Sequence, residues 1–243
     1  MIDLYKKEIS VFFSSIIGPL TIGLFLLING LLLWSDISTI NILNNAYASM
    51  DAFFSLAPLL FLLLIPAISM RALSEEYSNG TIETLTTKPI TKYQIILSKF
   101  LAVLSLVIIS IIPTFLYVIT IYFIGENTGN LDLANITGSY IGLIMLSSVF
   151  SSIGIFSSCI SKNQIIAFIL AIIFCAIFYF GFDVLSNIKM LQPIDIILQK
   201  SGISYHYNIM SKGLIQGSDI LYFISICFLF LKLSERIITL KKI

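Results

Sequence analysis

The chain has 243 residues, of which 58% are hydrophobic and 11% are charged, and its formal net charge is +1. Soluble domains contain about 25% charged residues, so this composition excludes an ordinary soluble fold and indicates an all-α integral membrane protein. The near-neutral charge includes no basic cluster, which argues against a nucleic-acid partner.

Cysteine and histidine provide little material for a metal site or a catalytic centre. Cys159, Cys175 and Cys227 lie in apolar runs without CxxC spacing, so neither a metal knuckle nor a disulfide framework is expected. The single histidine, His206, is too little for a zinc site or a histidine-based catalyst. We expect His206 at the outer surface near the lipid headgroups, and no cofactor or metal on this chain.

The N-terminal residues form an amphipathic pattern followed by a long apolar run. Apolar residues recur at helical spacing beside Asp3, Lys6 and Lys7, which predicts a helix over Asp3–Ile9 lying in the membrane interface. A cleaved signal peptide is the alternative, but its apolar region spans only about 7 to 15 residues. No charge occurs between residues 9 and 35, so we expect an uncleaved first span.

Six apolar runs are long enough to approach the roughly 20 residues that a helix needs to cross the bilayer. Pro58 and Pro66 are expected to kink the second span. The segment Asp183–Asp219 is too apolar for an open loop and predicts short helices that dip into the bilayer surface. All of this forms one transmembrane domain over residues 1–243, with spans near 12–34, 52–70, 100–124, 136–160, 164–182 and 216–233.

The distribution of Lys and Arg predicts the orientation. Eleven of them lie on the side that holds both termini and the segment Arg71–Lys99, whereas only Lys189, Lys200 and Lys212 lie on the other. Because basic residues concentrate on the cytoplasmic side, we expect both termini and Arg71–Lys99 in the cytoplasm.

Arg71–Lys99, which we call the polar segment, contains several local signals. Asn79-Gly80 indicates a turn, and Thr91 with Gln94 is a capping box that would begin the next helix. Between them, Thr81–Thr87 predicts a short helix or turn with Ile82 and Leu85 on one side and Glu83 on the other. Such a helix is either a docking element or a solvated loop whose charges keep it out of the membrane.

The polar segment also resembles a known family. The run EEYSNGTIETLTTKPITKYQIILSK is similar to the element after the second span of ABC-2 type transporter permeases, with an acidic pair, a Gly-Thr, a Glu-x-Leu, a Pro and a Lys. The segments KKEISVFFSSIIGPLTIGLFLLINGLLLW, APLLFLLLIPAISMRALSEE, GSYIGL and YFGFD resemble the permease subunit associated with bacterial gliding motility. The resemblance covers essentially the whole chain and departs at Asn79, where the family commonly has a small residue or Ser.

The resemblance implies an ATP-driven transporter subunit, an exporter linked to gliding motility in the inner membrane. By it, the polar segment holds a coupling helix that lies in a groove of a cytoplasmic ABC ATPase, and the turn at residues 162–164 makes a second contact. The segment 183–219 would correspond to re-entrant helices on the extracytoplasmic side. The implied ATPase-contacting residues are Glu75, Glu76, Gly80, Thr81, Glu83, Leu85, Pro89, Lys162, Asn163 and Gln164.

ATP is expected on a partner chain. The sequence contains no G-x-x-x-x-G-K-[ST] phosphate-binding motif, and six spans leave no room for a nucleotide-binding domain. The resemblance also implies pairing with an identical or related permease. Gly138 and Gly142 supply small residues for close helix packing, either between subunits or within one.

Three other classes of membrane protein are alternatives to an ABC permease. Glu75-Glu76 resembles the glutamate pair of prenyl-protein endopeptidases, but their EExxxR motif has Gly80 in its last position here. Ion-coupled transporters carry charges inside their spans, and the first five spans contain none. A membrane anchor that binds an ATPase without transport stays open, and no residue identifies the cargo.

Overall fold

The computed structural model describes residues 1–35, 41–42, 49–86, 89–125, 131–188 and 193–241. Within these residues all regular structure is helical, as the sequence predicts. The elements in chain order are α1 (Ile2–Ser14), α2 (Ile17–Trp34), α3 (Asp51–Ser69), α4 (Arg71–Ser78), α5 (Thr81–Thr86), α6 (Lys92–Ile111), η1 (Ile112–Thr114), α7 (Phe115–Ile124), α8 (Leu133–Ile160), α9 (Gln164–Ser186), α10 (Asp195–Lys200), α11 (Ile203–Met210) and α12 (Gly217–Leu240).

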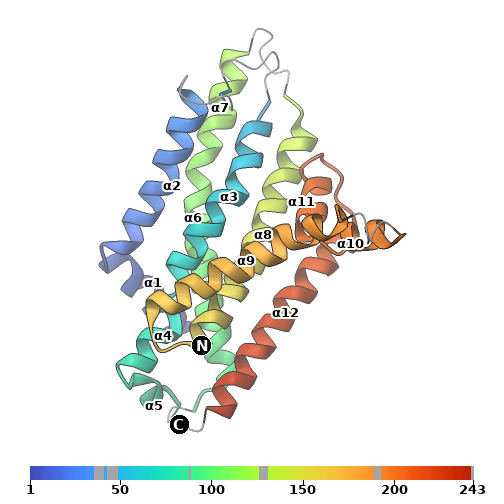
Figure 1. Ribbon diagram of the computed structural model, residues 1–243. Coiled ribbons are helices and arrows are strands. Elements are labelled where there is room, and N and C mark those ends of the chain that lie inside the picture. The colour runs from blue at the N-terminus through green and yellow to red at the C-terminus, as the bar shows by residue number, and fades with distance from the viewer. Residues whose placement is uncertain (36–40, 43–48, 87–88, 126–130, 189–192, 242–243) are drawn as a thin grey trace.

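Helix α8 is the centre of the bundle. It contacts α3, α4, α6, α9, α11 and α12, and Leu143, Leu146, Val149, Phe150 and Ile153 along it are fully buried. The helices α2, α3, α6, α7 and α8 run lengthwise beside one another, while α9 crosses them obliquely in the view of Figure 1. A displacement of any of these six helices therefore changes its contacts with α8.

Five helical segments of the described residues are long and apolar enough to cross a membrane. They are Ile17–Trp34, Asp51–Ser78, Lys92–Ile124, Leu133–Ile160 and Gln164–Ser186. Helix α12 is not in this set, and charged residues lie at both of its ends, Asp219 near the start and Lys232, Glu235 and Arg236 near the finish. The multi-pass membrane character is confirmed, whereas the sixth span stays a prediction.

The boundary between the interfacial helix and the first span lies later in the chain than predicted. Helix α1 extends to Ser14, and a separate α2 begins at Ile17, so the first span does not begin at residue 12. At this bend a Cβ on Gly18 would lie 2.4 Å from the carbonyl oxygen of Phe12. Only glycine permits so close an approach of the two helices.

The predicted third span is interrupted, which the sequence analysis missed. A 3-10 turn, η1, separates α6 from α7, and Pro113 lies in it. Proline has no amide hydrogen and cannot continue the helical hydrogen bonds, which explains the break. Elsewhere the predicted boundaries differ from the observed ones by a few residues, since α8 begins at Leu133 and α9 continues to Ser186.

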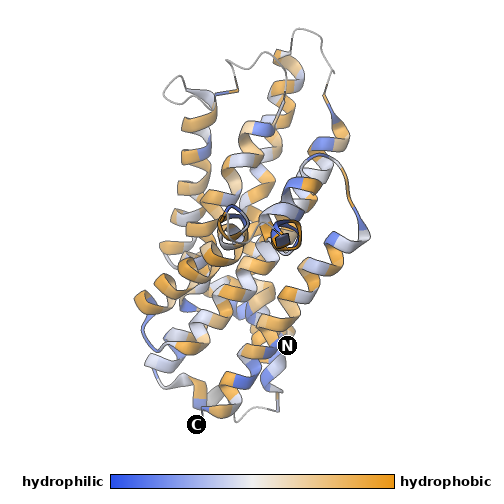
Figure 2. Cartoon of the chain, turned by 45° about the vertical axis from the view of Figure 1, so that its right-hand side comes forward, coloured by the Kyte–Doolittle hydropathy of each residue, from blue (hydrophilic) through white to orange (hydrophobic). Residues whose placement is uncertain are grey.

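Both termini lie at one end of the bundle together with α4 and α5 (Figure 1). The bundle helices are mostly hydrophobic along their lengths, and hydrophilic residues gather around this end (Figure 2). The termini and the polar segment therefore share one side, as the count of basic residues predicts. That this side faces the cytoplasm stays a prediction.

The short helices expected after the fifth span are present as α10 and α11, although their re-entry into a membrane stays a prediction. The prediction that His206 is a surface residue is wrong, because its side chain is only 12% exposed. Its Nδ1 lies 2.7 Å from the carboxylate of Asp219, and its Nε2 lies 2.8 Å from the carbonyl oxygen of Lys200. The ring joins α10 and α11 to the start of α12, where the buried Asp219 needs a polar partner.

Candidate functional site

The polar segment begins at an elbow between α3 and α4. Normally the first amides of a helix lack hydrogen-bond acceptors. Here the hydroxyl oxygen of Ser158, on α8, accepts hydrogen bonds from the amides of Leu73 (2.9 Å) and Ser74 (3.0 Å). The same hydroxyl donates to the carbonyl oxygen of Met70 at 3.1 Å. Helix α4 is thus capped by a side chain from another helix.

Helices α3 and α8 approach each other closely just before this cap. A Cβ on Gly154, one turn before Ser158, would lie 2.7 Å from the Cβ of Ser69. No side chain fits between the helices at this point, so the elbow has a fixed position on α8.

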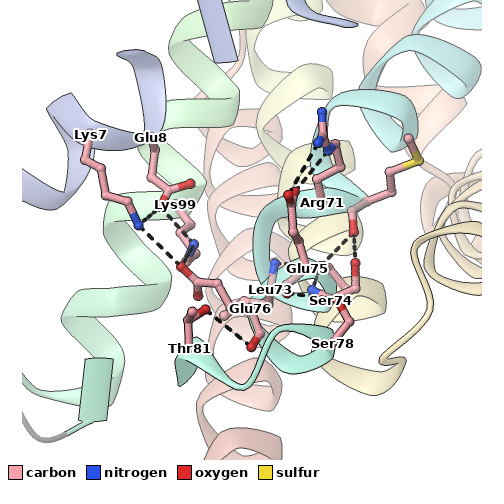
Figure 3. A network of polar contacts seen from close by, with 12 residues as sticks. Lys7, Glu8, Arg71, Leu73, Ser74, Glu75, Glu76, Ser78, Thr81 and Lys99 are labelled. Atoms are coloured by element: carbon pink, nitrogen blue, oxygen red, sulfur yellow. Dashed lines mark hydrogen bonds and ion pairs between the residues drawn. The ribbon is translucent and has the colours of Figure 1, made fainter. Parts of the chain in front are cut away.

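A buried ion cluster attaches α4 to α6 and α1 (Figure 3). The ammonium group of Lys99 on α6 lies 2.8 Å from Oε1 of Glu76 on α4 and 3.0 Å from Oε1 of Glu8 on α1. Lys99 is 1% exposed, and the two glutamate side chains are 11% and 18% exposed. Lys7, at 3.9 Å from both carboxylates, adds a second positive charge on the solvent side.

The position of Lys99 on its helix explains its burial. Ile95, Ile96 and Val103 lie three or four residues away on the same face, and all three are buried. A charge on such a face requires partners, because an isolated buried ammonium group is strongly disfavoured. The prediction that Lys99 belongs to the water-exposed polar segment is therefore wrong, and Lys99 instead joins three helices.

The end of α12 reaches the same region. The Lys241 ammonium group donates to the carbonyl oxygens of Cys159 (2.7 Å) and Ile160 (3.0 Å), the last residues of α8. It also lies 4.3 Å from the ring centroid of Tyr77 on α4. Partial burial lowers the pKa of Lys241, while a cation at a helix C-terminus is favoured by the helix dipole.

The exposed face of this end is formed by the turn and helix that the sequence predicts. Gly80 has a φ of +69°, which confirms the Asn79-Gly80 turn, and α5 follows it directly. Ile82 is buried and anchors α5, whereas Gly80, Thr81, Glu83 and Pro89 are exposed. The side chain of Leu85 and the whole of Lys88 lie outside the described part of the chain. The capping box is confirmed, with Thr91 Oγ1 accepting from the Gln94 amide at 3.3 Å.

The second predicted contact lies at the same end. Lys162 and Asn163 are exposed, Gln164 is half-buried, and Asn163 Oδ1 caps α9 by accepting from the Ile165 amide at 2.8 Å. Because α4 contacts both α8 and α9, the turn between those helices lies beside it. Two of the predicted residues point elsewhere, since Glu76 faces inward to Lys99 and Glu75 pairs with Arg71 at 3.0 Å.

A comparison with known families identifies the family of the chain. Residues 8–233, most of the chain, match the family described as ABC-2 family transporter protein. The chain belongs to the ABC-2 transporter family. Among curated proteins no match was found. Family membership makes this chain a permease subunit of an ABC transporter, a membrane component whose family implies an ABC ATPase partner.

In this ABC-2 permease, the sequence analysis did not identify the residues that hold α4 in place, and the ATPase contacts that it names stay predictions. Glu8, Lys99, Ser158 and Lys241 were not assigned to the site. Lys99 was detectable from its spacing with the apolar residues of α6. Ser158 was not, because nothing local distinguishes it from the other serines of α8.

A small cleft opens beside the ion cluster of the ABC-2 permease. It has a volume of about 70 Å³ and lies between α1, the α3–α4 elbow and α6. Glu8, Arg71, Glu75 and Lys99 line its polar part. Each of these charges already has an ion-pair partner, so the cleft adds no binding group to the site.

Proposed function

We propose that this chain is the six-span permease of an ATP-driven exporter, linked to gliding motility and located in the inner membrane with both termini cytoplasmic. The sixth span is α12, which packs along α8 and α6 and reaches the end that holds the termini (Figure 1). A separate ATPase chain holds ATP, and a second, identical or related permease completes the conduit.

The docking surface for the ATPase is formed by α4, α5 and the turn between α8 and α9. The observation that carries this proposal is that α4 is attached to the bundle by polar contacts to four helices. Lys99 and Glu8 hold it to α6 and α1, Ser158 holds it to α8, and Lys241 links it to α12. A helix so attached transfers a push on its exposed neighbour α5 to the whole bundle.

Transport then follows from a shift between two states of the bundle. ATP binding closes the ATPase dimer and displaces α4 and α5, and α3 and α6 move with them because the elbow and the ion cluster are rigid. The cargo must bind differently in the two states for ATP energy to move it.

Co-purification of the ATPase tests the docking surface. We expect the detergent-solubilised permease to retain its ABC ATPase and the variant Glu83→Arg/Lys162→Glu to lose it, because both exposed charges are reversed. The matched control is Lys212→Glu, an exposed lysine in the other half of the molecule. Equal ATPase recovery with all three proteins would overturn the assignment, and binding without nucleotide-dependent export would favour a membrane anchor.

A further inference from the structure

Pro58 leaves one carbonyl group of α3 without its helical partner. In a regular helix the amide four residues later donates to each carbonyl oxygen, so Phe54 would accept from residue 58. Proline has no amide hydrogen, and Pro58 lies inside α3. A buried carbonyl without a donor is costly in an apolar environment, so this position requires a donor from elsewhere.

The donor is the hydroxyl of Tyr207, on α11. It donates to the carbonyl oxygen of Phe54 at 2.6 Å, across 153 residues of sequence, and the hydrogen bond is buried. Tyr207 is 2% exposed. The hydroxyl thus replaces the amide hydrogen that Pro58 lacks, and the replacement joins α11 to α3.

Close packing against α8 fixes the position from which Tyr207 reaches α3. A Cβ on Gly138 would lie 2.5 Å from the carbonyl oxygen of Met210, and a Cβ on Gly142 would lie 3.4 Å from the Tyr207 ring. The hydroxyl of Ser139 donates to the carbonyl oxygen of Ser211 at 3.1 Å. These two glycines therefore serve packing within the chain, with α11 as their partner.

We infer that Tyr207 is a positioning residue that makes α11 move with α3. Helix α3 is bonded to α11 near its start, and it leads through the elbow at Met70 into α4 at its other end (Figure 1). A displacement of α4 therefore reaches α11 through α3, on the opposite half of the bundle. The direction of this transfer rests on the proposed function, whereas the hydrogen bond itself does not.

A double-mutant cycle tests the hydrogen bond on the permease in lipid nanodiscs. The reporter is Met210→Cys, a fully buried position on α11, and the measurement is its rate of maleimide labelling. Tyr207→Phe should raise this rate about tenfold, because a buried carbonyl loses its donor. Pro58→Ala restores an amide that bonds to Phe54, so adding Tyr207→Phe in that background should raise the rate less than about threefold.

Tyr205→Phe, on the same helix, is the matched control and should leave the labelling rate unchanged. An equal acceleration by Tyr207→Phe with and without Pro58→Ala would overturn the inference, because the hydroxyl would then not replace the missing amide. An unchanged rate in the Tyr207→Phe variant would overturn it as well.

The same reporter tests the transfer of movement once the ABC ATPase is bound. A non-hydrolysable ATP analogue should change the labelling rate of Met210→Cys, and Tyr207→Phe should abolish that change while the ATPase stays bound. The proposed transfer of movement would be overturned if the ATP analogue still changed the labelling rate in the Tyr207→Phe variant. It would also be overturned if the analogue did not change this rate in the parent protein. Failure of the ATPase to bind would instead overturn the proposed function, and the nucleotide-free cycle would still decide the hydrogen bond.

Discussion

Helices α4 and α11 are both eight residues long and both pack against α8, but at opposite ends of it. Helix α4 is held by charged groups, with Glu76 paired to Lys99 and the end of α8 bonded to Lys241. Helix α11 is held by glycine contacts with α8, by hydroxyl groups bonded to backbone carbonyls, and by His206, which is bonded to the Asp219 carboxylate of α12. A buried cluster of charges thus attaches α4 to α1 and α6, whereas the contacts of α11 with α3 and α8 consist of hydroxyl groups bonded to backbone carbonyls and of close glycine packing.

The largest loss of stability is expected when the positive charge that pairs with α4 is removed. Lys99→Met leaves the carboxylates of Glu8 and Glu76 without their cation, and breaking a buried ion pair from one side costs about 3 to 5 kcal/mol. Thermal unfolding of the detergent-purified permease should show the loss. Lys92→Met, a half-buried position on the same helix, is the control, and an equal shift in both variants would contradict the role of the cluster.

At the α11 end, Gly138→Ala should act through contact with backbone atoms. The added Cβ would meet the Met210 carbonyl oxygen at 2.5 Å and the Cα of Gly213 at 2.9 Å, and overpacking of this kind costs about 1 to 3 kcal/mol.

The same substitution at Gly23 should raise the stability of the protein, whereas at Gly138 it should lower it. Gly23 lies in α2 with no atom within 4 Å of an added Cβ, so alanine should stabilise this helix by up to about 1 kcal/mol. Unfolding temperatures of the two variants should therefore move apart, and a shift in the same direction would contradict the packing of α11 on α8.

A further variant tests the role of the cap at the α3–α4 elbow. Ser158→Ala removes the acceptor for the amides of Leu73 and Ser74, and loss of a helix cap costs about 1 to 2 kcal/mol. Hydrogen exchange at these two amides should accelerate. Ser157→Ala is the control, because that hydroxyl donates to Ile153 within its own helix, and exchange that is equally fast in both variants would argue against capping by Ser158.

Local signals in the sequence predicted local structure well. The Asn79-Gly80 turn, the short helix after it and the Thr91 capping box each depend on residues a few positions apart, and all three are present. The ion pairs of Lys99, in contrast, involve Glu8, 91 residues away, and Glu76, 23 residues away. The burial of Lys99 could have been inferred from the apolar residues three and four positions away, but no periodicity within one helix predicts its distant partners, so the ion cluster was missed.

His206 illustrates the same limit in the other half of the chain. His206 was expected at the outer surface near the lipid headgroups, but its ring bonds to Asp219 and Lys200 from neighbouring helices. The break at η1 is a different failure, because Pro113 was visible in the sequence and its effect on the helix was not considered. The family resemblance predicted membership that the match over residues 8–233 confirms, and the finer assignments of ATPase contacts stay predictions.

The hydrogen bonds of α3 and α4 also impose an order on biogenesis. Ser158 follows Met70 by 88 residues, and Tyr207 follows Phe54 by 153, so α3 and α4 are synthesised well before these partners. Unsatisfied backbone groups in hydrocarbon cost several kcal/mol each. A nascent chain that ends after α7 therefore lacks the hydroxyl groups that complete the elbow and the Phe54 carbonyl, and both sites are completed only when α8 and α11 have been synthesised.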